Sequence, residues 1–471
     1  MGKELGSEQL TTSQTKSLNK LEGDKALLLW LRGREAWNDW MKKHPEAEVS
    51  FEGVVFSYLA LSERLKGKRP VPQKLKSYVD FSGYIFNGYI SFDGAEFHSK
   101  ALFRNAKFSG VSSFFHTCFK DLVHFSNSEF HDRTDFSSVE FINEVDFSRV
   151  KFKNFADFFN ANFGSLSEFY EIEVWETINF RSSVFLEETQ FIGAVFKNNV
   201  SFTRAKFFGG AVFNRASFCK EFSLKNCQFL SNVDFGNASF GNTFYCSPLN
   251  SEKIKSIDFK GASFEKSFSI SGHFECIPDL RLTKTSHHVD LSHLSVKLNR
   301  IFIKNCGLER AIDAEDSERL CRLKEIAESN KNHNRALAFH ADEQRASRWG
   351  VLNSWQSMLD MLYSLTSNYG QSLARPCFYL VLSIILFAAF SLKQPENIHK
   401  EEGQLKTALT ISIATVTPFI SISKIEREAG IKKLYGQKPP EDYGLYSYAH
   451  AGISFVFIFL IGLGLRNRYR I

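Results

Sequence analysis

The sequence has few of the patterns that mark catalytic or metal-binding proteins. Its eight cysteines are scattered and no two of them form a CxxC pair, so neither a zinc site nor a disulfide framework is indicated. It also contains no phosphate-binding loop, no HExxH pair and no nucleophile elbow. We therefore expect reduced thiols in a cytoplasmic setting, no cofactor, no metal and no enzymatic activity.

Strong charge of either sign is also missing. The net charge is +6 over 471 residues, which is too weak to indicate a nucleic-acid partner. Residues 79–245 carry 15 Lys/Arg against 19 Asp/Glu, a net charge of only −4. Neither a basic nucleic-acid-binding surface nor a strongly acidic one is therefore expected.

Phenylalanine is the residue present in excess, with 49 copies against 14 Tyr and 6 Trp. Between Phe81 and Phe240 it recurs in steps that alternate between five and six residues, which makes a repeat of 11. Phe fills 28 of the thirty positions of this ladder, and Val174 and Leu224 fill the other two. A second column, two residues before each ladder position, is almost always small or β-branched.

A solenoid of short β segments accounts for this ladder, and an α-helix does not. A five-residue step turns a helix by roughly 140°, which would spread the ladder around the helix. In a strand, a ladder Phe and the small residue two before it point the same way, and stacked coils bury rings that one coil would expose. We expect the ladder to form the solenoid core, for example at Phe136, Phe141, Phe147, Phe152, Phe158 and Phe163.

The stretches DFSRVKF, ANFGS and NRASF resemble the pentapeptide-repeat family, whose unit is a central Leu or Phe with a small residue two before it. The resemblance implies a right-handed quadrilateral β-helix with four short faces per coil. Every second step here has one extra residue, so we expect each coil to combine two five-residue and two six-residue steps, with a bulge at alternate corners. The chain looks like an 11-residue, Phe-rich variant of bacterial type that carries a C-terminal membrane module with two spans.

The sequence pattern divides the chain into five parts. Polar residues without the apolar core of a signal peptide predict a disordered N-terminal tail, and a solenoid end needs a cap. The predicted parts are a tail over 1–22, a capping helix over 23–50, the β-helix over 51–300 with a basic insertion at 62–76, a helical neck over 301–370 and a membrane module over 371–471. We expect the insertion to be a solvated loop.

Two apolar stretches in the last part are long enough to span a bilayer. Residues 376–392 and 444–465 are uncharged and number 17 and 22. Arginines before the first and after the second predict, by the positive-inside rule, that both termini and the solenoid are cytoplasmic at an inner membrane. A buried hairpin of a soluble core is the alternative.

A third uncharged segment, 407–423, lies between the two spans. As a re-entrant segment it would line a pore, and as an interfacial helix it would cover the bilayer surface. It has no TVGYG filter and no Asp or Glu that could form a carboxylate ring. The candidate pore or interface residues are Thr407, Thr410, Thr415, Thr417 and Pro418.

These features predict a membrane-anchored cytoplasmic scaffold or sensor. Its expected partners are membrane lipid and an unknown cytoplasmic protein on the solenoid faces. The alternative is an oligomeric two-span ion channel or membrane-permeabilising effector gated by the solenoid, with a homo-oligomer formed through the membrane module. The resemblance also suggests a DNA mimic that protects topoisomerases, but the weak charge and the spans argue against it, and no nucleic-acid partner is expected.

Overall fold

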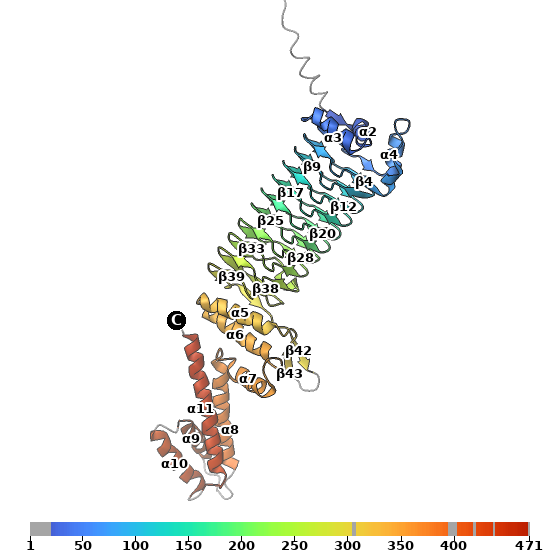
Figure 1. The fold of residues 1–471 in the computed structure, drawn as a ribbon. Helices are drawn as coiled ribbons and strands as arrows, with labels where there is room; N and C mark the ends of the chain where they lie inside the picture. The colour runs from blue at the N-terminus through green and yellow to red at the C-terminus, as the bar shows by residue number, and fades with distance from the viewer. Residues whose placement is uncertain (1–19, 304–307, 394–402, 418–420, 437–438, 470–471) are drawn as a thin grey trace, which may run out of the picture. The chain divides into compact units, whose positions relative to one another are not determined.

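The computed structural model describes residues 20–303, 308–393, 403–417, 421–436 and 439–469 (Figure 1). The chain forms two compact units. The first contains Met1–Asn299 with Glu318–Arg335, and the second contains Arg300–Ser317 with Ala336–Ile471.

The first unit is a β-solenoid of four parallel sheets, in which each coil adds one short strand to each sheet (Figure 1). One coil runs through β6 (Ile90–Ser91), β7 (Glu96–Phe97), β8 (Lys100–Leu102) and β9 (Lys107–Phe108) before β10 (Ser112–Ser113) pairs with β6. We call the sheets that contain β6, β7, β8 and β9 faces 1 to 4. Ser112 lies opposite Ile90, which is the register that two five-residue and two six-residue steps require, and face 4 has ten strands. The solenoid fold predicted from the ladder is confirmed.

The ladder phenylalanines fill the axis. The six core residues named from the sequence are each at most 1% exposed. Each ring stacks on the ring one coil away: the Phe147 centroid lies 5.0 Å from that of Phe125 and 5.1 Å from that of Phe169. It also meets Phe136 edge-on, at 85°. Stacked and edge-to-face pairs are both favourable ring geometries, so every coil supports the next.

Alternate corners of the coil have different geometry. Between faces 1 and 2 and between faces 3 and 4, the ladder carbonyl accepts a hydrogen bond from the third residue after it, as in Ala106 N to Phe103 O at 3.1 Å. The residue before that donor has a positive φ, for example 55° at Asn105 and 59° at Asn127. This is the type II turn, in which Gly and Asn are favoured. The six-residue steps lie at the other two corners, where a bulge was predicted.

Two helices, rather than the one predicted, cap the first coil. They are α2 (Gly23–Trp30) and α3 (Arg34–Lys43). The chain turns between them at Gly33, whose φ of 96° an L side chain rarely adopts. Trp30 stacks on Phe81 at 5.2 Å, and Trp37 is fully buried with its indole N–H donating to Ile85 O. The two indoles cover the exposed end of the Phe stack.

The solenoid also starts earlier than predicted. Strand β1 (Lys20–Glu22) pairs with β2 (Glu48–Ser50) on face 1, so the expected tail over 1–22 overlaps an ordered strand. Residues 1–19 lie outside the described residues. The basic insertion 62–76 is not a plain loop, because it begins in α4 (Tyr58–Arg64) and ends in the 3-10 helix η1 (Gln73–Lys76).

The far end of the solenoid is closed by a helix that returns from the next segment. The last solenoid strands include β39 (Lys284–Thr285), β40 (Val289–Asp290) and β41 (Leu294–Val296). Helix α5 (Asp316–Ser329) belongs to this unit from Glu318 onward and buries Leu320, Leu323 and Ala327. The predicted neck therefore contributes its first helix to the solenoid.

The second unit begins with an antiparallel hairpin, β42 (Arg300–Ile303) and β43 (Leu308–Ala311), where a helical neck was predicted from 301. The helices that follow are α6 (His333–Ser347), α7 (Ser354–Ser367), α8 (Ala374–Lys393), α9 (Gln404–Val416), α10 (Ser421–Tyr435) and α11 (Tyr443–Arg468). By length and composition, α8 and α11 are able to cross a membrane. They are antiparallel, because Asn467 of α11 donates to Gly370 O before α8, while Phe390 lies 4.5 Å from Tyr446 at the opposite end.

Substitution of two adjacent phenylalanines tests whether the ladder residues form the solenoid core. Phe158 is fully buried and stacks on Phe136 and Phe180 at 4.8 and 4.9 Å, whereas Phe159 is 44% exposed. We expect Phe158→Ala to lower the free energy of unfolding by about 3–5 kcal/mol through cavity formation. Phe159→Ala should change it by less than about 1 kcal/mol. Urea unfolding followed by circular dichroism measures both, and equal losses would contradict the assignment of the axis.

Candidate functional sites

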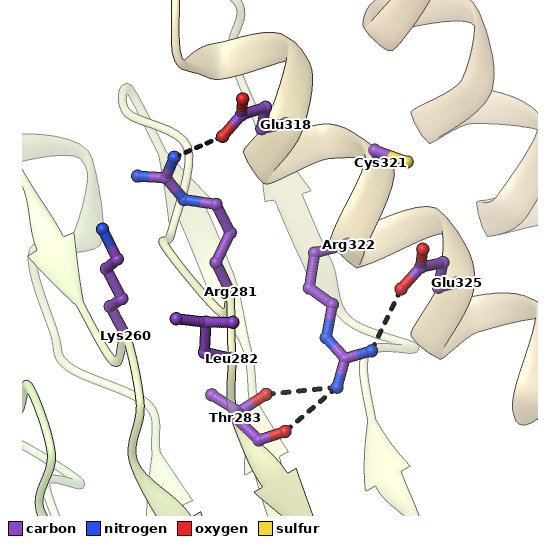
Figure 2. A pocket seen from close by; sticks show the side chains of 8 residues that line it. All are labelled: Lys260, Arg281, Leu282, Thr283, Glu318, Cys321, Arg322 and Glu325. Atoms are coloured by element: carbon purple, nitrogen blue, oxygen red, sulfur yellow. Dashed lines mark hydrogen bonds and ion pairs between the residues drawn. The ribbon is translucent and has the colours of Figure 1, made fainter.

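A cavity of about 590 Å³ lies between the last coils and α5 (Figure 2). Its two arginines have carboxylate partners. Arg281 contacts Asp279 at 2.6 Å and Glu318 at 2.7 Å. Arg322 reaches from α5 to the carbonyl oxygen of Thr283 at 3.1 Å and contacts Glu325 at 3.0 Å (Figure 2). The complete lining is Lys260, Arg281, Leu282, Thr283, Glu318, Cys321, Arg322 and Glu325.

The contacts of Arg281 with Asp279 and Glu318, and of Arg322 with Thr283, hold α5 against the last coils, and we call them the latch. Burial of the Asp279 carboxyl acts to raise its pKa, but the hydrogen bonds and charge of Arg281 outweigh burial and hold the pKa below its ordinary value. The side chain of Asp279 is only 7% exposed, so the pair is shielded from solvent. The arginines that line the cavity therefore fasten α5 to the solenoid, and both have carboxylate partners within the lining.

The threonines predicted from the sequence do not form a common lining within this chain. Their hydroxyls donate to carbonyls of their own helix: Thr407 to Gly403, Thr410 to Lys406 and Thr415 to Ile411, at 3.2, 2.9 and 2.7 Å. Thr415 is fully buried against the neighbouring helices. Thr417 bonds the Ser423 hydroxyl at 2.8 Å. Pro418 lies outside the described residues.

A polar cluster that was not singled out in the sequence lies among α8, α9 and α11. His450 Nε2 lies 3.3 Å from Ser412 Oγ, and His450 Nδ1 lies 3.4 Å from Ser454 Oγ. Ser454 in turn lies 3.4 Å from Ser383 Oγ, and the Phe387 ring stacks on the imidazole at 4.5 Å. The sequence signal was available, since His450 stands alone in an apolar run that has no Asp, Glu, Lys or Arg.

A family model described as pentapeptide repeats (9 copies) matches residues 92–140, which cover parts of all four faces. The chain contains pentapeptide repeats. No curated protein and no solved structure matches it. Outside the matched residues, the same coil register extends the pentapeptide-repeat solenoid through β33 (Ser239–Phe240), which pairs with β29 (Ser217–Phe218).

Helix α7, in the second unit, exposes its apolar side chains and buries its polar ones. This is the reverse of an amphipathic helix in a soluble protein. Its outward face is apolar, and Trp355 and Leu362 are 67% and 57% exposed. Its inward face is polar: Ser357 is fully buried, and Asp360 pairs with Arg348 at 2.5 Å. The remaining outward side chains are Met358, Leu359 and Leu365. This helix lies within the predicted neck, and its exposed apolar face was not predicted from the sequence.

The latch of the pentapeptide-repeat cap predicts a specific acid sensitivity. Because the folded-state pKa of Asp279 lies below the ordinary value of about 3.9, its stabilising effect is complete above that value and is lost as pH falls through the folded pKa. Asp279→Asn should unfold more easily than wild type at pH 7, and the difference should shrink between pH 5 and pH 3.

Asp39→Asn is the matched control, because the Asp39 side chain is 69% exposed. Urea midpoints measured across this pH range give the comparison. A difference between wild type and Asp279→Asn that stays constant with pH would show that the Asp279 carboxylate does not stabilise the cap.

Proposed function

We propose that this chain is a membrane-anchored interaction scaffold. The helices α7, α8 and α11 attach it to a lipid bilayer, and the pentapeptide-repeat solenoid binds a protein partner. The observation that carries the proposal is the reversed distribution of polar and apolar side chains on these helices. The solenoid is proposed to act by binding through its outward side chains.

The two long helices share the reversed pattern of α7. On α8, Phe378 and Leu386 are 62% and 61% exposed, while Ser391 is fully buried. On α11, Phe459 is 62% exposed, while Ser454 is fully buried. A soluble hairpin would bury the apolar faces and expose the polar ones, because exposed apolar surface is costly in water. Hydrocarbon favours the reverse, so the pattern supports insertion over a soluble core.

Helix α7 extends the proposed lipid contact beyond the two spans. It lies directly before α8, and Arg375 in the first turn of α8 donates to Ser364 O at 2.9 Å. A bilayer interface would accept its apolar face together with the indole of Trp355. The polar face of α7 packs against the rest of the helical unit. There, burial and a hydrogen bond to Asp360 raise the pKa of Tyr369 to about 12.

We place the solenoid in the cytoplasm of the cell, at an inner membrane. The support comes from the unpaired cysteines and not from the Lys and Arg residues that flank the two apolar helices. Cys118, Cys219, Cys227, Cys246 and Cys377 are free thiols, and Cys227 and Cys246 are buried within the solenoid. Burial raises the pKa of both thiols, so they remain in the protonated, unreactive form. Unpaired cysteines are typical of a reducing compartment.

A second function, ion passage through an oligomer, is favoured by the cluster around His450. Ionisable side chains inside spanning segments often mark ion or proton pathways. In this proposal several copies assemble through the helical unit, and the solenoid gates them.

The test is ion flux into liposomes that contain the full chain. A His450→Ala change would remove the ionisable group of this cluster and should reduce cation flux. Absence of flux from inserted wild type would remove this function and leave the scaffold.

A spin label tests membrane insertion at matched positions. Ile385 on α8 is 52% exposed and Leu249 on the solenoid is 53% exposed. In a background without Cys219 and Cys377, we expect a label at Ile385→Cys to collide more often with oxygen than with a water-soluble nickel complex, since oxygen concentrates in hydrocarbon. A label at Leu249→Cys should show the reverse. A water-like signal from Ile385→Cys in liposomes would contradict anchoring.

Impermeant maleimide tests the orientation. In a cysteine-free background, Lys424→Cys lies on α10 between the two spans, and Arg468→Cys lies at the end of α11. We expect intact cells to label Lys424→Cys, and Arg468→Cys to react only after permeabilisation. The opposite pattern would place the solenoid outside the cytoplasm.

A further inference from the structure

One corner of the solenoid carries an apolar column through five consecutive coils. The position directly after the ladder residue of face 2 holds, one per coil, Ile142, Gly164, Leu186, Phe208 and Leu230. We call this column the corner stripe. Ile142, Leu186 and Phe208 are 50%, 43% and 45% exposed, and Leu230 is half-buried.

The coils hold the stripe in register. The N–H of Leu186 donates to Phe163 O at 2.9 Å, and that of Phe208 donates to Phe185 O at 2.8 Å. At Gly164 a Cβ would lie 2.7 Å from the carbonyl oxygen of Ile142, so the close approach of the coils requires glycine there. The stripe is therefore a straight ridge with one notch, and its members are spaced about 4.8 Å apart.

Solvent exposure does not require apolar residues at this position. The two preceding coils have His98 and Lys120 in the same place, and Lys120 contacts Glu96 at 2.7 Å. Isolated exposed apolar residues are ordinary on a protein surface, but a contiguous row marks an interaction site. The change from polar to apolar begins at Ile142.

A group of carboxylates lies along one side of the stripe, on the corner and on face 3. It consists of Glu144, Asp146, Glu168, Glu187, Glu188 and Asp234, which we call the acidic band. The five segments that carry stripe and band (142–146, 164–168, 186–190, 208–212 and 230–234) contain no Lys or Arg. Within the described solenoid, no lysine or arginine forms an ion pair with the band. Burial and the neighbouring carboxylates of Asp146 and Glu144 raise the pKa of Glu168.

These observations indicate which kind of molecule can bind the corner stripe. Nucleic acid and anionic lipid would be repelled by the acidic band. A peptide cannot join the side of the solenoid as a strand, because the backbone groups of each face pair with the coils before and after it. A helix aligned with the stripe fits, since its pitch of about 5.4 Å is close to the coil spacing of about 4.8 Å. Four coil steps match about 13 residues of helix.

We propose that the corner stripe and the acidic band form a docking site for a basic amphipathic α-helix of a protein partner. Apolar side chains of the helix, one per turn, lie on Ile142, Leu186, Phe208 and Leu230, and a bulky one enters the notch at Gly164. Lysines and arginines on one flank of the helix contact the carboxylates of face 3. The proposal rests on the scaffold function and specifies the partner class.

The test uses the full-length protein in non-ionic detergent and a fluorescein-labelled peptide that is long enough for about five turns of helix. The peptide is built of Leu, Lys and Ala, with Leu at helical spacing and Lys on one flank. The stripe variant is Leu186→Asp with Phe208→Asp. Its control is Phe115→Asp with Phe159→Asp, at residues 41% and 44% exposed on the corner between faces 1 and 2. Both variants add two negative charges, so non-specific attraction of the cationic peptide is matched.

We expect the peptide to bind wild type and the control variant alike, and the stripe variant at least about tenfold more weakly by fluorescence anisotropy. Glu187→Lys with Glu188→Lys should also weaken binding and reduce its salt dependence. Equal binding to the stripe and control variants would overturn the proposal, as would equal binding of a peptide with Glu in place of Lys, or absence of binding to wild type.

A second copy of the chain is the competing occupant. Concentration-dependent dimerisation of wild type that is lost in the stripe variant, without peptide binding, would assign the stripe to self-association and overturn the proposal. Failure of the docking site leaves the spin-label result at Ile385→Cys unchanged, and failure of membrane anchoring leaves peptide binding unchanged. The two failures are therefore distinguishable.

Discussion

Stacking of phenylalanine rings along the solenoid axis is the interaction on which the rest of the first unit depends. Rings one coil apart lie nearly parallel, with centroids such as those of Phe136 and Phe158 separated by 4.8 Å. That distance equals the spacing of hydrogen-bonded strands, so the rings and the sheets impose the same rise per coil. Each coil buries its rings only against its neighbours, which makes the array cooperative and leaves two ends that need covers. The indoles of Trp30 and Trp37 cover one end, and α5 with the Asp279–Arg281 latch covers the other.

The solenoid was predictable because its rule is local and repeated. A five-residue step with a small residue at the inward position two before the Phe can form only a few structures, and the alternating five- and six-residue steps predicted that alternate corners differ in geometry. The elements that sequence reasoning missed depend on partners elsewhere in the chain. The break at Gly33 exists because two tryptophans must reach the same end of the stack. Helix α5 is assigned to the first unit through contacts with the coils, including the hydrogen bond from Arg322 to Thr283 O.

The second unit was less predictable, since hydropathy gives the length of a span but not its packing. The segments 376–392 and 444–465 fall inside α8 and α11, but hydropathy did not show that His450 of the second segment contacts Ser412 of α9. The threonines of 407–417 looked like a polar face, but helix backbone carbonyls accept their hydrogen bonds. The flanking arginines were also a weak guide to orientation. Eight Lys/Arg lie within 393–443, more than the six (Arg345, Arg348, Arg375, Arg466, Arg468 and Arg470) at the other end of the spans, and the positive-inside rule compares both sides. The proposed cytoplasmic orientation therefore rests on the free thiols.

The repeat that fixes the core also determines how a solenoid can evolve a binding surface. Inward positions are constrained by the rings, and the turn positions with a positive φ, such as Asn105 and Asn127, are constrained by the backbone. Most of the remaining outward positions are less constrained by the fold, and each lies directly beside its equivalent in the next coil. Substitutions at one position in successive coils therefore create a straight column rather than a scattered patch. The change from His98 and Lys120 to Ile142, Leu186 and Phe208 along one such column costs the fold little, since the polar residues show that the corner does not need apolar side chains. A column that departs from polar composition without a folding reason is the form that a functional surface takes on this architecture.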